Sequence, residues 1–186
     1  MESADPGSVR RVLLVGFMGS GKTSVGRRLA RLLGWAFHDF DARVESVAGG
    51  SVSEIFRRHG EARFRELEAE VGRRLLTAER AVLASGGGWP AREGRMESLP
   101  EGTLSVWLWV SPEEAVRRAR AEGATRPLLA SEDAVERARK LLEERLPHYR
   151  KASLVLDSES APPEGLARTI HESMSVGTAR HEILPS

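Results

Sequence analysis

The sequence contains no cysteine, which excludes disulfide frameworks, zinc–thiolate sites and thiol catalysis. Asparagine and glutamine are also absent, and lysine occurs only at Lys22, Lys140 and Lys151 among the 28 lysine and arginine residues. Because arginine stands at all the other positions of this charge, a lysine inside a motif indicates that the motif requires that side chain.

No apolar run approaches the roughly 20 residues of a membrane helix, and the polar, acidic start at residues 1–8 is unlike a signal peptide. The chain carries 28 basic and 27 acidic residues, a net charge of +1. This near balance argues against a protein that mainly holds nucleic acid or an anionic membrane. We therefore expect a cytoplasmic protein that binds neither nucleic acid nor a membrane. Separately, we expect it to be a monomer.

The length of 186 residues, 40% of them hydrophobic and 30% charged, suits one α/β domain. Strands alternating with helices indicate a parallel sheet that is covered on both faces. Short apolar runs predict strands at 11–15, 35–39, 81–84, 104–110 and 154–156. Helical spacing or helix-start residues predict helices at 22–33, from 51, at 61–76, from 111, at 134–146 and at 163–174.

Residues 16–23, GFMGSGKT, match the phosphate-binding pattern G-x-x-x-x-G-K-[ST] between a predicted strand and a predicted helix. Glycines let such a loop turn its backbone N–H groups toward phosphate oxygens, and the helix N-terminus adds partial positive charge. Lys22 is expected to reach the β- and γ-phosphates, and the Thr23 hydroxyl to ligate Mg²⁺. The residues predicted to bind ATP here are Gly16, Met18, Gly19, Ser20, Gly21, Lys22, Thr23 and Ser24.

Several classes of nucleotide-binding protein do not fit the rest of the sequence. Guanine-specific GTPases normally read the base with an asparagine in an N-K-x-D loop, and this chain has no asparagine. The chain is also short for a helicase or a AAA-type motor. Small-molecule kinases remain.

Two carboxylates, Asp39 and Asp41, stand at the end of the second predicted strand. The carboxyl ends of parallel strands line the ligand crevice, and alternation would turn both side chains toward the phosphates if the strand continues to Asp41. One carboxylate, Asp39, is expected to position Mg²⁺ through water, while Asp41 accepts a hydrogen bond from the alcohol to be phosphorylated. The alternative is that Asp41 caps a helix that begins at Ala42.

Six motifs in the same order resemble the shikimate kinase family between about residues 11 and 170. The triple glycine together with R-P-L-L distinguishes this family from adenylate- and gluconate-type kinases. The motifs are the phosphate loop, F-x-D-x-D at 37–41, G-E-x-x-F-R at 60–65, the triple glycine at 86–88, R-P-L-L at 126–129 and E-R-x-x-x-Y at 144–149.

The resemblance implies a single domain with the P-loop NTPase fold, a three-layer α/β/α architecture with a five-stranded parallel sheet of the nucleoside-monophosphate-kinase type. It also implies a mobile lid at about 122–133 and an acceptor-binding region at about 39–70. The implied reaction transfers the γ-phosphate of ATP, with Mg²⁺, to the 3-hydroxyl of shikimate and yields shikimate 3-phosphate and ADP.

Site residues follow from the matching motif positions. A carboxylate such as that of shikimate is best held by guanidinium groups, which bind it in a bidentate way and stay charged. The family motifs give this role to Arg65 and Arg145. The residues implied to bind shikimate are Asp41, Arg65, Gly86, Gly87, Gly88 and Arg145.

The implied catalytic residues are Asp41, Lys22 and Arg126. Arg126 is also expected to contact ATP, and Arg120 stands where the family tends to place an arginine that stacks on adenine. Most other arginines are interpreted as solvated partners of glutamates on helix faces. These are Arg63, Arg73, Arg74, Arg117, Arg118, Arg137 and Arg139.

Two other functions remain open at this point. One is a kinase of the same fold that phosphorylates another small polyol acid. The other is a sensor domain that binds shikimate without turnover. Trp89, directly after the glycines, is bulky and is expected to alter the wall of the substrate pocket.

Overall fold

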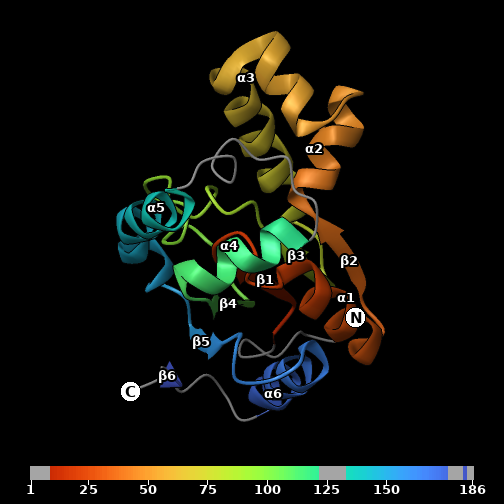
Figure 1. The fold of residues 1–186 in the computed structure, drawn as a ribbon. Coiled ribbons are helices and arrows are strands. Elements are labelled where there is room, and N and C mark those ends of the chain that lie inside the picture. The colour runs from red at the N-terminus through yellow and green to blue at the C-terminus, as the bar shows by residue number, and fades with distance from the viewer. Residues whose placement is uncertain (1–8, 122–132, 176–181, 184–186) are drawn as a thin grey trace.

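The computed structural model describes residues 9–121, 133–175 and 182–183. A parallel sheet in the order β2-β3-β1-β4-β5-β6 forms its centre (Figure 1). The predicted five-stranded parallel sheet is confirmed, and the two-residue β6 adds a short pairing at its edge. The strands are β1 (Arg11–Val15), β2 (Ala36–Asp39), β3 (Ala81–Ala84), β4 (Thr103–Trp109), β5 (Leu154–Asp157) and β6 (Glu182–Ile183).

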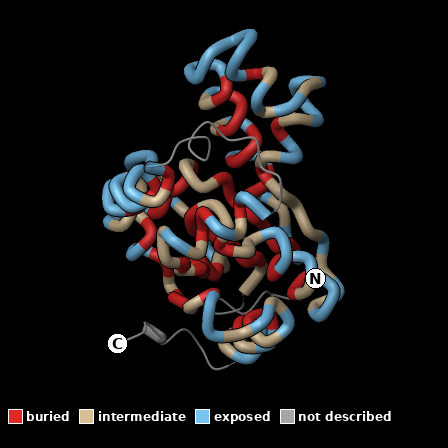
Figure 2. Tube along the Cα trace, viewed as in Figure 1, coloured by how far each residue is buried: buried red, intermediate tan, exposed pale blue. Residues whose placement is uncertain are grey.

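Helices cover both faces of this sheet. Alternation along β1 sends Val12 and Leu14 into one hydrophobic core and Leu13 and Val15 into another. The first core is closed by α1 and α6, and the second by α2, α3, α4 and α5. Buried residues accordingly concentrate along the strands and the inner helix faces (Figure 2). The helices are α1 (Lys22–Leu33), α2 (Phe40–Ala48), α3 (Val52–Leu75), α4 (Pro112–Ala121), α5 (Ala134–Tyr149) and α6 (Pro163–Ser175).

Helix α3 begins at the predicted capping box, in which the Ser51 side chain and the Glu54 backbone and side chain bond reciprocally. The two helices predicted on either side of Gly60 form one element with a kink at that residue, where φ is 77° and ψ is 173°. Glycine adopts such a conformation at little cost. Helices α2 and α3 project from the body of the molecule, at the top of Figure 1.

Helix α5 continues to Tyr149, beyond its predicted end at Leu146, although Pro147 lies inside it. Proline removes one backbone donor, which costs less in the last turn than in the middle of a helix. The longer helix places Tyr149 one turn after Arg145 and therefore on the same face.

The structure places the side chain of Trp89, which was expected to alter the wall of the substrate pocket, inside the protein, and its effect on that wall stays a prediction. Its side chain is buried in the core, where its ring meets the edge of Phe40 with centroids 5.4 Å apart. The indole fits there because α3 carries glycine at position 72, and a Cβ at Gly72 would lie 2.5 Å from Trp89 Nε1.

Replacing Gly72 with alanine is expected to lower the free energy of unfolding by about 1–2 kcal/mol, because the overpacking cost exceeds the gain in helix propensity. Chemical denaturation measures this change. The double variant Gly72→Ala/Trp89→Leu should show a favourable coupling free energy, because the smaller side chain removes the clash. Equal stability of Gly72→Ala and the unmodified chain would contradict this packing.

Within the part of the chain that the structure describes, every helix is too short or too polar to cross a lipid bilayer.

Candidate active site

The predicted phosphate loop connects β1 to α1 at the carboxyl edge of the sheet. At Gly19, φ is +70°, and a Cβ there would lie 2.7 Å from the carbonyl oxygen of Ala115 in α4. Glycine is therefore required both for the backbone conformation and for the close approach of α4. The loop ends at Gly21, directly before the N-terminus of α1, so its backbone lies where an anion is favoured.

Lys22 directs its ammonium group back into this loop. Its Nζ donates to the carbonyl oxygens of Gly16, at 2.9 Å, and Phe17, at 2.8 Å, and lies 3.4 Å from Ser20 Oγ. The positive charge is thus held inside the curl of the loop, beside the helix N-terminus. Both features attract the phosphates of a nucleotide.

Asp39 joins the phosphate loop to the next element of the site. Its Oδ2 accepts a hydrogen bond of 2.8 Å from the hydroxyl of Thr23, and its Oδ1 accepts from the backbone N–H of Asp41, at 3.0 Å, and of Ala42. Asp39 is therefore the N-cap of α2. The proposed alternative, in which Asp41 caps this helix, is wrong.

The strand also ends at Asp39, and α2 begins at Phe40, so alternation along an extended strand does not orient Asp41. Asp41 lies in the first turn of α2 and faces the glycine turn after β3. A Cβ at Gly86 would lie 2.9 Å from Asp41 Oδ1 and 2.7 Å from Glu68 Oε1. A larger residue at position 86 would displace one of these carboxylates from its present place.

Two guanidinium groups approach the same turn from different helices. A Cβ at Gly88 would lie 3.0 Å from Nη1 of Arg65 in α3, and a Cβ at Gly87 would lie 3.3 Å from Nη1 of Arg145 in α5. The structure therefore brings together the acidic and basic side chains and the three glycines that were predicted to bind the acceptor. They gather beside the phosphate loop, since the Cβ position of Gly87 is also 3.5 Å from the Gly16 carbonyl oxygen.

The family model described as Shikimate kinase matches residues 18–175 of this chain. The chain belongs to the shikimate kinase family. A shikimate kinase of Moorella thermoacetica is 45% identical over 163 residues, which are 88% of this chain and 93% of the relative. One of Thermodesulfovibrio yellowstonii is 38% identical over 172 residues, 91% of this chain and 99% of the relative.

The fold agrees with solved shikimate kinase structures. The shikimate kinase of Acinetobacter baumannii, solved in complex with shikimate, superposes with a TM-score of 0.84 and 34% sequence identity, over 91% of this chain and 95% of that one. These relationships confirm the expected P-loop kinase class and the use of ATP.

Sequence reasoning missed Glu68, which the structure places under Arg65. Its side chain is only 2% exposed, and its Oε2 accepts a hydrogen bond of 2.9 Å from Arg65 Nη1. Burial alone would lower the pKa of Arg65, but the hydrogen bonds with Glu68 and Glu61 outweigh it and raise this pKa. Arg65 therefore stays charged. The only sequence signal for Glu68 was its spacing of three residues from Arg65 on a helix.

Tyr149, the single tyrosine of the chain, lies beneath the glycine turn. Its hydroxyl donates a hydrogen bond of 2.7 Å to the carbonyl oxygen of Gly87, and the side chain is fully buried. Burial raises the pKa of Tyr149 to about 12, although the positive charge of Arg145 acts in the opposite direction.

An alkaline titration should therefore show phenolate absorbance in the folded chain only near pH 12, the raised pKa of Tyr149, whereas the unfolded chain should titrate near pH 10. Between these two pH values the unfolded chain has lost this proton and the folded chain has kept it. Stability is accordingly expected to fall as the pH rises through this window. Native phenolate absorbance that appears already near pH 10 would contradict the assigned burial.

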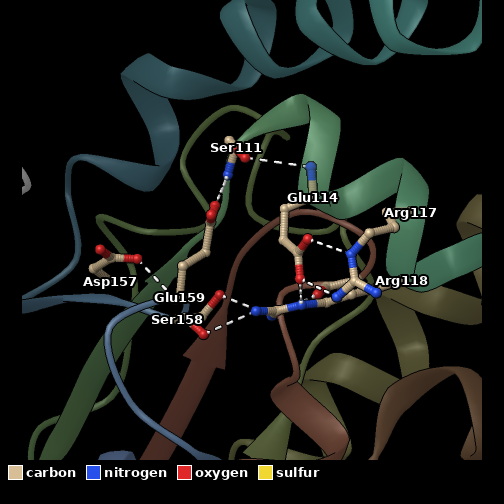
Figure 3. A network of polar contacts seen from close by, with 8 residues as sticks. Ser111, Glu114, Arg117, Arg118, Asp157, Ser158 and Glu159 are labelled. Atoms are coloured by element: carbon tan, nitrogen blue, oxygen red, sulfur yellow. Dashed lines mark hydrogen bonds and ion pairs between the residues drawn. The ribbon is translucent and has the colours of Figure 1, made fainter.

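Arg118 was interpreted as a solvated partner of a glutamate, and this interpretation is wrong. It does pair with Glu114, but Nη1 also donates to the carbonyl oxygen of Gly19 and to Ser158 Oγ, both at 3.2 Å. Figure 3 shows Arg118 reaching from α4 to Ser158, which follows β5. The spacing of charges along α4 could not reveal that this face covers the phosphate loop. Arg117 pairs with Glu114 and is mostly exposed, as expected.

The structure does not place two of the arginines that were predicted to contact ATP in the site. Arg120 is an exposed residue near the end of α4. Arg126 lies outside the described residues, as does the predicted lid at 122–133 except for Asp133, which precedes α5. Their roles remain predictions.

Proposed function

We propose that this chain transfers the γ-phosphate of ATP to the 3-hydroxyl of shikimate and releases shikimate 3-phosphate and ADP. The observation that carries the proposal is the convergence of Arg65, Arg145 and Asp41 on one glycine turn beside the phosphate loop. This arrangement supplies what a small acid with hydroxyl groups requires, namely guanidinium groups for its carboxylate and an acceptor for a hydroxyl proton.

On the donor side, the loop from Gly16 to Ser24 would hold the phosphates of ATP. Lys22 would exchange its bonds to the loop carbonyls for bonds to the β- and γ-phosphates, and it would then stabilise the charge that develops during transfer. The resemblance gives Arg126, in a lid over residues 122–133, a further positive charge for this step, and gives Arg120 a place beside the adenine.

The residues around Thr23 fit a magnesium ion that is held mainly by phosphates and water. Among the described residues, no group of three or more histidine or acidic side chains could hold a metal ion by itself. The Thr23 hydroxyl would be a direct ligand and Asp39 would bind through water, as Mg²⁺ commonly retains waters. Ser85 directly follows Ala84, the residue that pairs with Asp39 in the sheet. The hydroxyl of Ser85 is buried and has no hydrogen-bond partner among the described residues. The ion would neutralise phosphate charge.

On the acceptor side, Arg65 and Arg145 would bind the carboxylate of shikimate. Asp41 would accept the hydrogen bond of the 3-hydroxyl and orient its oxygen toward the γ-phosphate. The glycines at 86–88 would let the backbone approach the ring closely. Phosphoryl transfer depends mostly on such positioning and on charge stabilisation. We further propose that the protein acts in the cytoplasm as a monomer.

A coupled assay of ADP release, with purified protein and ATP·Mg²⁺, tests this function. Shikimate is expected to support turnover, whereas gluconate and adenylate are not, and shikimate 3-phosphate should be recovered as product. Turnover with gluconate instead would favour a kinase of another polyol acid. Binding of shikimate by calorimetry without ADP release would favour a sensor domain and contradict the proposal.

A further inference from the structure

In the glycine turn, the peptide between Gly87 and Gly88 has an orientation that glycine residues alone do not fix. The N–H of Trp89 donates to the carbonyl oxygen of Gly86 at 3.0 Å, so residues 86–89 form a β-turn whose central peptide joins Gly87 to Gly88. Neither central glycine has a positive φ, as in a type I turn. With glycine at both central positions, turns with the opposite orientation of that peptide are also accessible.

One side chain fixes the orientation of the central peptide. The hydroxyl of Tyr149 donates to the Gly87 carbonyl oxygen at 2.7 Å. In a trans peptide, a carbonyl and the following N–H point in opposite directions, and among the residues that the structure describes no peptide bond is cis. The Gly88 N–H therefore points away from Tyr149.

Burial shows which way this N–H points. Tyr149 lies fully inside the core, where its ring packs on Trp107 with centroids 5.8 Å apart. Gly87 and Gly88 are partly exposed, so the side opposite to Tyr149 is the open side of the turn. Within the described part of the chain, the Gly88 N–H donates to no backbone carbonyl. A reversed peptide would present the Gly87 carbonyl to the open side and break its hydrogen bond with the Tyr149 hydroxyl.

We infer that Tyr149 is a positioning residue, which holds the Gly87–Gly88 peptide with its N–H toward the acceptor and joins this turn to the helix that carries Arg145. The inference rests on the proposed function for the identity of the acceptor. Tyr149 touches no reacting atom. Its effect is indirect. The Gly88 N–H, which would bind an oxygen of the acceptor, is held in place by Tyr149, and Arg145, which would bind the acceptor's carboxylate, lies on the same last turns of α5.

The decisive variant is Tyr149→Phe, which keeps the ring and removes only the hydroxyl. The KM for shikimate is expected to rise about threefold to tenfold, because the lost hydroxyl holds the Gly87 carbonyl and also shares a side-chain hydrogen bond with Arg145. The KM for ATP should stay within about twofold, because the phosphate loop does not contact the hydroxyl. Nuclear magnetic resonance of the chain labelled with ¹⁵N-glycine should show shifted or broadened amide signals of Gly87 and Gly88.

Ser105→Ala is the matched control. Ser105 is as deeply buried as Tyr149, and its hydroxyl accepts a hydrogen bond of 2.9 Å from the Ser153 N–H, away from the glycine turn. This variant removes a buried hydroxyl that is hydrogen-bonded to both the N–H and the hydroxyl of Ser153, so it should lose at least comparable stability without a change in the KM for shikimate. A rise in that KM equal to the rise in Tyr149→Phe would assign the effect to stability and overturn the inference.

Two further outcomes separate this inference from the proposed function. If the unmodified chain phosphorylates shikimate and Tyr149→Phe has the same KM for it, the inference is wrong and the function stands. If the unmodified chain does not use shikimate, the function is wrong, and the glycine signals alone decide about the turn. Unchanged Gly87 and Gly88 signals in Tyr149→Phe would then overturn the inference.

Discussion

Replacing Asp41 with asparagine is expected to reduce kcat with shikimate by about 10²–10⁴-fold, the range for loss of a positioned group that accepts a proton. The amide has nearly the same shape but offers less basicity and can present N–H donors to the attacking hydroxyl. Helix α2 should remain intact because Asp39, not Asp41, caps it. Affinity for ATP, measured by calorimetry, should change little.

Asp157 offers a matched control for this substitution. It is also a carboxylate at the carboxyl end of a strand, and its Oδ1 accepts a hydrogen bond from the Glu159 N–H. Asp157→Asn should leave kcat within about twofold of the unmodified chain, because nothing places this residue in the acceptor site. Near-normal turnover by Asp41→Asn would remove Asp41 from the mechanism.

Replacing Arg145 with alanine is expected to lower kcat/KM for shikimate by the equivalent of about 2–5 kcal/mol, as for a hydrogen-bonded charge whose partner is lost. Arg145 lies beside Gly87 and over the ring of Phe17, 5.6 Å from its centroid. Arg145→Lys should recover only part of the loss, because an ammonium group cannot bind a carboxylate with two parallel N–H donors.

Arg137→Ala is the control for Arg145→Ala, because Arg137 is an exposed residue of the same helix. Its removal should leave kcat/KM for shikimate within about twofold, as for most exposed substitutions. Steady-state kinetics with varied shikimate and saturating ATP measure both variants. An unchanged kcat/KM in Arg145→Ala would show that the carboxylate binds elsewhere.

The phosphate loop and the strands around it could be predicted because their signals are local. A glycine-rich turn between an apolar strand and a helix specifies its own conformation, and buried parallel strands appear as continuous apolar runs. The family motifs then identified the residues that meet at the glycine turn. That meeting depends on α2, α3 and α5 packing together around the strand ends, which no single segment encodes.

Tertiary packing also explains which roles could not be predicted from the sequence. Glu68 and Arg118 both belong to arginine–glutamate pairs with helical spacing, and such pairs are typical of solvated surfaces. Packing buries Glu68 beneath Gly86 and presses Arg118 against the phosphate loop. Asp39 rather than Asp41 caps α2, because the chain turns into a helix at Phe40, two residues earlier than the alternative assumed.

Asp39 has a consequence for how the binding of one substrate affects the binding of the other. One oxygen of its carboxylate is bonded to Thr23 and the other to the first turn of α2, the turn that carries Asp41. When a bound nucleotide draws the Thr23 hydroxyl toward its metal ion, the Asp39 carboxylate that caps α2 loses this hydrogen-bond partner. Thermodynamic linkage makes this influence mutual. If the nucleotide changes the affinity for the acceptor through α2, the acceptor changes the affinity for the nucleotide by the same factor. The two substrates should therefore bind with measurable cooperativity.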